Sequence, residues 1–160
     1  MSNLSLVDAL GLPPRCRVAV VGAGGKTSLL FRLARALAGP VLVSNTAHLA
    51  VEQGVFADRV ISAVRPADLP DKSGPIPGVT LITGPVDPRG RTGGLEGEML
   101  DGLLRVADGW SAPLLIEADG SRGRPLKAPA EWEPPIPAFV DMVVVVAGLS
   151  GLGKAMTEEW

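Results

Sequence analysis

A chain of 160 residues with a formal net charge of -2 is sized for one domain, and it lacks the strongly basic character of nucleic-acid-binding or membrane-surface proteins. Its 46% of hydrophobic residues is ordinary for a globular protein, and the one cysteine, Cys16, cannot form an internal disulfide, which favours a reducing compartment. With no signal-peptide pattern and no apolar run of about 18 residues, we expect a single cytoplasmic domain, 1–160, with no nucleic acid or membrane as partner.

Short apolar runs without polar alternation recur along the chain, and they are typical of strands that are buried on both faces of a parallel sheet. In chain order the expected elements are a strand at 17–21, a helix at 27–38, a strand at 41–44, a weaker helix at 46–53, a strand at 59–62, a helical turn at 66–69, a strand at 79–83, a helix at 95–107, and strands at 113–118 and 142–147. This alternation predicts an α/β fold with a mostly parallel sheet, in a three-layer sandwich like that of P-loop NTPases and Rossmann-like domains.

Two proline-rich segments, 63–78 and 119–141, do not fit this alternation. The second is the more informative because it joins two expected strands without a helical pattern. Structureless loops longer than roughly 12 to 15 residues are uncommon in compact domains, and they are usually functional or disordered. We predict that the loop packs over the carboxyl end of the sheet near Gly24, where open α/β folds bind ligands, with Trp132 anchoring its return.

The clearest motif is the stretch VVGAGGKTSLL, which leads from the first expected strand into the first expected helix. Such a glycine-rich corner is typical of a dinucleotide fingerprint or a P-loop, since both direct backbone N–H groups at an anion. The fingerprint G-x-G-x-x-G counted from Gly22 would end on Thr27, whose side chain impedes the close approach that glycine permits. The segment Gly25-Lys26-Thr27 instead matches the end of a P-loop, with an ammonium for the β/γ-phosphates and a hydroxyl for Mg²⁺.

This loop is two residues shorter than the standard G-x-x-x-x-G-K-T/S pattern. A compressed G-x-x-G-K-T/S form occurs in the Mur-ligase and folylpolyglutamate-synthase group, so the shortening is compatible with ATP or GTP bound with Mg²⁺. The alternative is a tight turn with Lys26 in solvent, which the positive end of the helix dipole disfavours. The loop residues expected to bind nucleotide are Gly22, Ala23, Gly24, Gly25, Lys26, Thr27 and Ser28.

Candidate catalytic carboxylates follow a later strand, in the stretch LLIEADGSRGRPLKAP. Glu117 and Asp119 are two residues apart, so they share one face if the strand continues that far. Either could order the attacking water, and together with Thr27 they are the expected metal ligands. A capping role for Asp119 is the alternative. Basic residues on the following loop, which are either phosphate contacts or a solvated surface, are Arg122, Arg124 and Lys127.

His48 is the only histidine, and it lies at an expected strand-to-helix turn. It could contact phosphate or transfer a proton near neutral pH, and it is a third candidate catalytic residue. A purely structural role is the alternative.

The chain resembles the YqeC-like family of selenium-dependent hydroxylase accessory proteins. The resemblance is carried by VVGAGGKTSLLFRLARAL and LLIEADGSRGRPLKAPAEWEPPIP, and it continues to DMVVVVAGLSGLGKAMTEE near the end. Of the family's threonine-rich run before its histidine, only Thr46 and His48 carry over here. Members of the family continue beyond the GLGK segment, so we expect this chain to lack a C-terminal extension.

The resemblance implies a nucleotide-binding, P-loop-like domain that assists the maturation of molybdenum-dependent hydroxylases, some of which contain selenium. A molybdenum hydroxylase, or a protein that matures its cofactor, is then the implied partner. Three functions remain open on these grounds. The first is NTP hydrolysis or phosphoryl transfer, the second is a nucleotide-gated chaperone or scaffold without turnover, and the third is a Mur-ligase-like ligase or small-molecule kinase.

Overall fold

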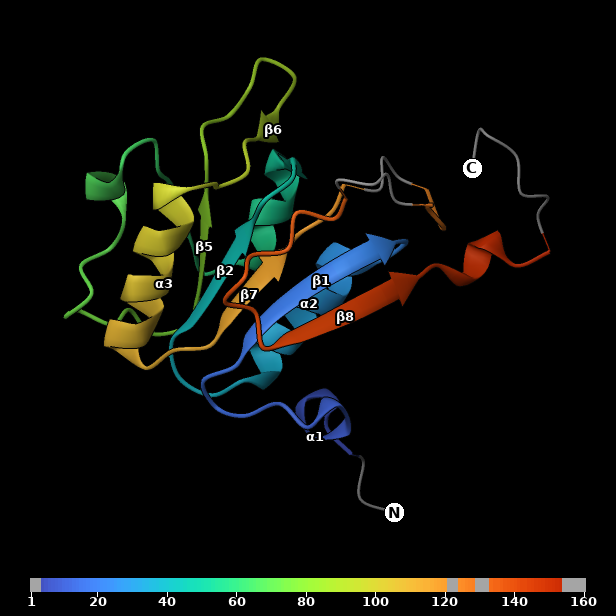
Figure 1. The fold of residues 1–160 in the computed structure, drawn as a ribbon, viewed down its shortest axis with the longest axis horizontal. Helices are drawn as coiled ribbons and strands as arrows, with labels where there is room; N and C mark the ends of the chain where they lie inside the picture. The colour runs from blue at the N-terminus through green and yellow to red at the C-terminus, as the bar shows by residue number, and fades with distance from the viewer. Residues whose placement is uncertain (1–3, 121–123, 129–132, 154–160) are drawn as a thin grey trace.

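The computed structural model describes residues 4–120, 124–128 and 133–153, which form a central sheet with helices on both of its faces (Figure 1). The helices are α1 (Leu6–Leu10), α2 (Lys26–Ala36) and α3 (Glu98–Trp110), with 3-10 turns η1 (Val51–Phe56), η2 (Pro66–Asp68) and η3 (Leu149–Gly151). The strands are β1 (Arg17–Ala23), β2 (Val41–Asn45), β3 (Leu49–Ala50), β4 (Arg59–Ser62), β5 (Val79–Thr83), β6 (Arg91–Thr92), β7 (Leu114–Glu117) and β8 (Met142–Ala147). All six predicted strands are therefore confirmed.

The main sheet has the strand order β4-β5-β2-β7-β1-β8, and every pairing in it is parallel. Helices α1 and α2 pack on one face through a cluster that includes Leu30, Leu33 and Val43. Helix α3 packs on the other face, where Leu103 belongs to a second cluster with Leu42 and Ile116. The expected three-layer α/β sandwich with a parallel sheet is confirmed.

The structure corrects two sequence-based expectations about individual elements. Residues 46–53 do not form the weak helix: Leu49 and Ala50 instead pair with β6 in a separate two-stranded sheet, and η1 begins only at Val51. Burial of Leu49, which is 2% exposed, and this strand pairing override a weak helical pattern.

Strand β8 is not buried on both faces, although its run of valines suggests that it is. It forms an edge of the sheet, and Val145 on its outer side is 73% exposed. Helix α3 lies beside β5 and β2, at the far side of the sheet from β8 (Figure 1), so it does not cover this strand.

The central strands place their carboxyl ends together. Glu117, the last residue of β7, is in register with Asn45 of β2 on one side and with Val20 of β1 on the other. Strand β1 continues for three more residues into the glycine corner. Because carboxyl ends of parallel strands share one edge of the sheet, the corner and Glu117 are neighbours.

Candidate functional site

The glycine corner is a tight turn between β1 and α2 that requires residues without side chains. Gly24 has a φ of +78°, and a Cβ there would lie 2.6 Å from the Cα of Gly148 and 3.0 Å from the carbonyl oxygen of Pro125. Gly25 is the left-handed N-cap of α2 and offers no side-chain acceptor. The first amides of α2 therefore have no side-chain cap from this residue, and such amides are suited to binding an anion.

Lys26 is the first residue of α2, and its side chain turns back toward the corner. The Nζ atom donates a hydrogen bond of 2.9 Å to the carbonyl oxygen of Gly22 and lies 3.7 Å from Oε1 of Glu117. Lys26 is only 3% exposed, so the alternative of a lysine in solvent is wrong. The structure places a buried positive charge beside the N-terminus of α2.

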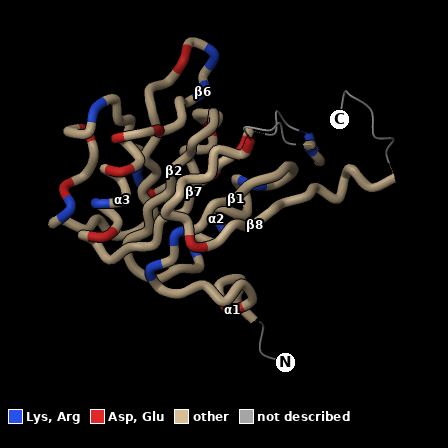
Figure 2. The backbone as a smooth tube through the Cα atoms, viewed as in Figure 1, with Lys and Arg blue, Asp and Glu red and all other residues tan. Residues whose placement is uncertain are grey.

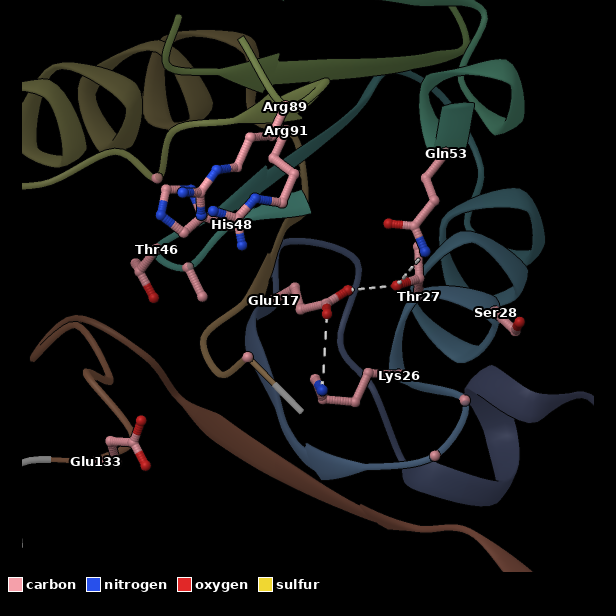
Figure 3. Close-up of a pocket in the computed structure, with 15 residues that line it drawn as sticks. Lys26, Thr27, Ser28, Thr46, His48, Gln53, Arg89, Arg91, Glu117 and Glu133 are labelled. Atoms are coloured by element: carbon pink, nitrogen blue, oxygen red, sulfur yellow. Dashed lines mark hydrogen bonds and ion pairs between the residues drawn. The ribbon is translucent and has the colours of Figure 1, made fainter. Parts of the chain in front are cut away.

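Thr27 connects the same carboxylate to a third side chain (Figure 3). Its hydroxyl donates to Oε2 of Glu117 at 2.7 Å and accepts a hydrogen bond of 3.1 Å from Nε2 of Gln53. Burial raises the pKa of the Glu117 carboxyl above its ordinary value, while the hydrogen bond from Thr27 and the charge of Lys26 act in the opposite direction. Glu117 thus contacts an ammonium and a hydroxyl that both suit a nucleotide phosphate site.

Asp119 forms a second carboxylate–lysine pair. Nζ of Lys127 lies 2.5 Å from Oδ1 of Asp119 and 2.6 Å from Oε2 of Glu133, and it also donates to the carbonyl oxygen of Gly120. The amide of Gly22 donates to Oδ2 of Asp119 at 3.3 Å. Burial lowers the pKa of Lys127, but its hydrogen bonds to the two carboxylates outweigh this and raise it overall.

The proline-rich loop packs against the glycine corner, as the sequence predicts. The carbonyl oxygen of Pro125 accepts a hydrogen bond of 2.7 Å from the amide of Gly148, and both residues lie within 3.0 Å of the position of a Cβ on Gly24. Arg122 and the proposed anchor Trp132 lie outside the described residues. The predicted packing near Gly24 is therefore confirmed at Pro125, while the role of Trp132 stays a prediction.

A cavity of about 1000 Å³ lies beside the glycine corner, at the carboxyl ends of the central strands. Its lining residues come from the glycine corner and the start of α2, the β2–β3 turn, η1, the segment around β6, the end of β7 and the segments that follow it. They are Gly24, Gly25, Lys26, Thr27, Ser28, Thr46, Ala47, His48, Gln53, Arg89, Arg91, Gly94, Glu117, Gly120 and Glu133.

The structure divides the predicted site residues into two groups. Seven of them line the cavity together, and these are Gly24, Gly25, Lys26, Thr27, Ser28, His48 and Glu117. Gly22 and Ala23 belong to β1 beside it. The other described candidates, Asp119, Arg124 and Lys127, do not line it either. Their roles in binding or catalysis stay predictions.

The lining residues that the sequence patterns do not single out include Gln53, Arg89 and Arg91. The arginines lie in GPVDPRGRTGG, a turn-rich stretch that directly follows β5. Loops after parallel strands extend over the carboxyl edge of the sheet, so two arginines there are a usable signal for a binding residue. Gln53 has no comparable signal, because its place depends on the turn that replaces the expected helix.

The side-chain oxygens of Thr27 and Glu117 fit a magnesium ion only if a bound molecule supplies further oxygen ligands to the same ion. Among the described residues, no group of three or more His, Cys, Asp and Glu side chains is placed to hold a metal ion. Protein-bound Mg²⁺ commonly uses one or two carboxylates together with substrate phosphates and waters. Thr27 and Glu117, with 2.7 Å between their oxygens, fit that partial ligand set, whereas Asp119 is occupied by Lys127.

The comparisons with known proteins identify the family. The model of the family described as YqeC protein matches residues 18–160. The chain is also 39% identical over 167 aligned residues to the Uncharacterized protein YqeC of Escherichia coli (strain K12), and the match covers 97% of this chain and 60% of that protein. The chain therefore belongs to the YqeC family, and it spans about three fifths of the length of this curated relative.

A search of solved structures finds no match. Within the part of the chain that the structure describes, no helix combines the length and apolar character needed to cross a membrane.

Proposed function

We propose that this chain binds ATP or GTP with Mg²⁺ at the glycine corner. The observation that carries the proposal is the single carboxylate of Glu117, which contacts the ammonium of Lys26 at 3.7 Å and the hydroxyl of Thr27 at 2.7 Å beside a helix N-terminus. A lysine, a hydroxyl and a carboxylate on a glycine turn are the groups with which P-loops bind phosphate and metal.

Each residue has a distinct part in this site. The first amides of α2 and the ammonium of Lys26 would bind the phosphates, and Thr27 with Glu117 would hold the metal. Bound Mg²⁺ supplies positive charge that offsets charge developing on the phosphates. Glu117 also has a pKa raised by burial, which suits a carboxylate that orders or deprotonates an attacking hydroxyl or water.

We further propose that nucleotide binding or turnover serves the maturation of molybdenum-dependent hydroxylases, some of which contain selenium. Support comes from the resemblance of the glycine corner and the LLIEADGSRGRPLKAP stretch to that accessory family. The chain spans 60% of the length of its relative, so we attribute an activity of that longer protein to this chain only as part of the proposal.

Calorimetric titration with Mg-ATP and Mg-GTP tests the binding step directly. We expect saturable binding of at least one of them, and no binding to the folded chain would overturn the proposal. Phosphate release with and without a purified molybdenum hydroxylase then separates two versions of the function. Release stimulated by the hydroxylase indicates an enzyme, and binding without release indicates a nucleotide-gated scaffold.

A further inference from the structure

Three nitrogen-bearing side chains line the cavity from a region separate from the glycine corner. They are His48, Arg89 and Arg91, which we call the basic cluster. Figure 3 shows the basic cluster together on one side of Glu117, with Lys26 on the other side. The cavity therefore has basic side chains in two regions, with a carboxylate between them.

Backbone pairing holds the basic cluster in place. Strand β3 pairs with β6 in antiparallel register, with Ala50 opposite Arg91, and a further bridge closes the hairpin that carries Arg89. Nδ1 of His48 lies 3.1 Å from the carbonyl oxygen of Thr92. Since a carbonyl can only accept, His48 carries a proton on Nδ1, and its Nε2 is left for a ligand. The small sheet thus fixes the segments that carry all three side chains.

The two arginines differ in their pairing. Arg91 lies 3.4 Å from the carboxylate of Asp87 in the same hairpin, which carries charges of both signs (Figure 2). Among the described residues, the Arg89 guanidinium has no carboxylate partner. A guanidinium presents a planar fork of donors that fits a phosphate or a carboxylate with two hydrogen bonds.

One continuous cavity is lined by both the glycine corner and the basic cluster. Its volume of about 1000 Å³ is at the upper end of the roughly 300 to 1,000 Å³ that is usual for one small-molecule ligand.

We propose that the basic cluster binds the anionic group, a phosphate or a carboxylate, of a second small-molecule substrate bound beside the nucleotide. This inference rests on the proposed function, and it names the chemical class of the acceptor. It also assigns the arginines to the acceptor and not to the nucleotide phosphates, which lie at the glycine corner.

The experiment uses inorganic phosphate and malonate as probes of the two anion classes. Each is titrated into the full chain saturated with Mg-ADP, and separately into the Lys26→Ala variant without nucleotide, where the glycine corner is weakened. The test variants are Arg89→Gln, Arg91→Gln and the double substitution. Arg105→Gln, an exposed arginine on α3 away from the cavity, is the matched control.

At least one probe should bind in both backgrounds, and the double substitution should weaken it by about 10-fold or more, the scale of a lost charge-assisted hydrogen bond. Affinity for Mg-ADP should stay within about threefold, and Arg105→Gln should change neither. Phosphate and malonate distinguish a phosphorylated acceptor from a carboxylic acid.

Two results would overturn the inference. One is that neither probe binds in either background, and the other is that the double substitution weakens Mg-ADP as much as it weakens the probe, which would assign the arginines to the nucleotide. The same experiment distinguishes failure of the proposed nucleotide site. If Mg-ADP does not bind, but a probe binds the Lys26→Ala variant and the arginine substitutions weaken that binding, the anion site stands and the proposed function is wrong.

Discussion

Glu117 and Asp119 differ sharply although they are two residues apart and are both almost buried, at 7% and 3% exposure. Each faces a lysine. Glu117 lines the cavity and lies 3.7 Å from Lys26, whereas Asp119 is held 2.5 Å from Lys127, outside the residues that line the cavity. One carboxylate is accessible to a ligand, and the other ties the proline-rich loop to the end of the sheet.

The reason for the difference is where the strand ends. Residues i and i+2 share a face only within a strand, and β7 ends at Glu117. Beyond it the chain is no longer part of the regular strand, and Asp119 accepts hydrogen bonds from the amide of Gly22 and from Lys127. Two similar carboxylates therefore acquire different environments, and we expect their substitutions to have different effects.

The largest expected difference is in turnover. Glu117→Gln should reduce phosphate release by about 10²-fold or more, the scale of losing one acid–base or electrostatic contribution, while nucleotide affinity changes only a few fold. Asp119→Asn, measured in parallel, should reduce the rate much less. Equal losses of turnover in the two variants would contradict the assignment of different roles to the two carboxylates. Unchanged turnover in both would mean that other residues carry out the chemistry.

The two lysines should differ in nucleotide affinity. Lys26→Ala removes a charge-assisted contact to phosphate worth roughly 1.5 to 3 kcal/mol, so the dissociation constant should rise about 10- to 150-fold. Lys127→Ala should raise it only a few fold, because Lys127 is engaged by Asp119 and Glu133. Calorimetry on both variants measures this, and a larger effect at Lys127 would contradict the assignment of the glycine corner.

For folding stability the two lysines should rank in the opposite order, with Lys127→Ala lowering the free energy of unfolding more than Lys26→Ala does. Lys127→Ala leaves the buried Asp119 with the amide of Gly22 and without its cation, which costs about 2 kcal/mol. Lys26→Ala should cost less, since Glu117 keeps the hydrogen bond from Thr27. Urea unfolding followed by circular dichroism gives both values. Lys127→Met, which keeps most of the aliphatic stem, separates loss of charge from loss of packing.

The sequence predicts the parallel sheet and the glycine corner well because both depend on local patterns. Buried strands appear as short apolar runs, and Gly25-Lys26-Thr27 is itself the start of a helix. The basic cluster is not predictable in this way. Arg89 reaches the cavity through pairing between β3 and β6, and those two-residue strands are too short to leave a periodic pattern.

The different environments of Glu117 and Asp119 are equally hard to predict from the sequence. It depends on the last residue of β7 and on a lysine eight positions farther along the chain. Strand ends are set by hydrogen bonds with neighbouring strands, which spacing alone does not reveal.

The smallest expected effect is a pH dependence of stability at Glu117. Burial raises its pKa above the ordinary 4.5, so the folded chain keeps a proton that the unfolded chain releases. The stability linked to this proton is fully present below about pH 4.5 and is lost as the pH rises through the folded pKa. The unfolding free energy of the unsubstituted chain minus that of Glu117→Gln should therefore decrease on going from about pH 4 to 7.

Asp58 provides a control of opposite sign: its hydrogen bonds from Arg35 and the amide of Val79 lower its pKa, so the stability that Asp58→Asn removes is lost as the pH falls. A Glu117 difference that is flat or increases with pH would mean that the hydrogen bond from Thr27 and the charge of Lys26 offset or outweigh the effect of burial, which would contradict the raised pKa.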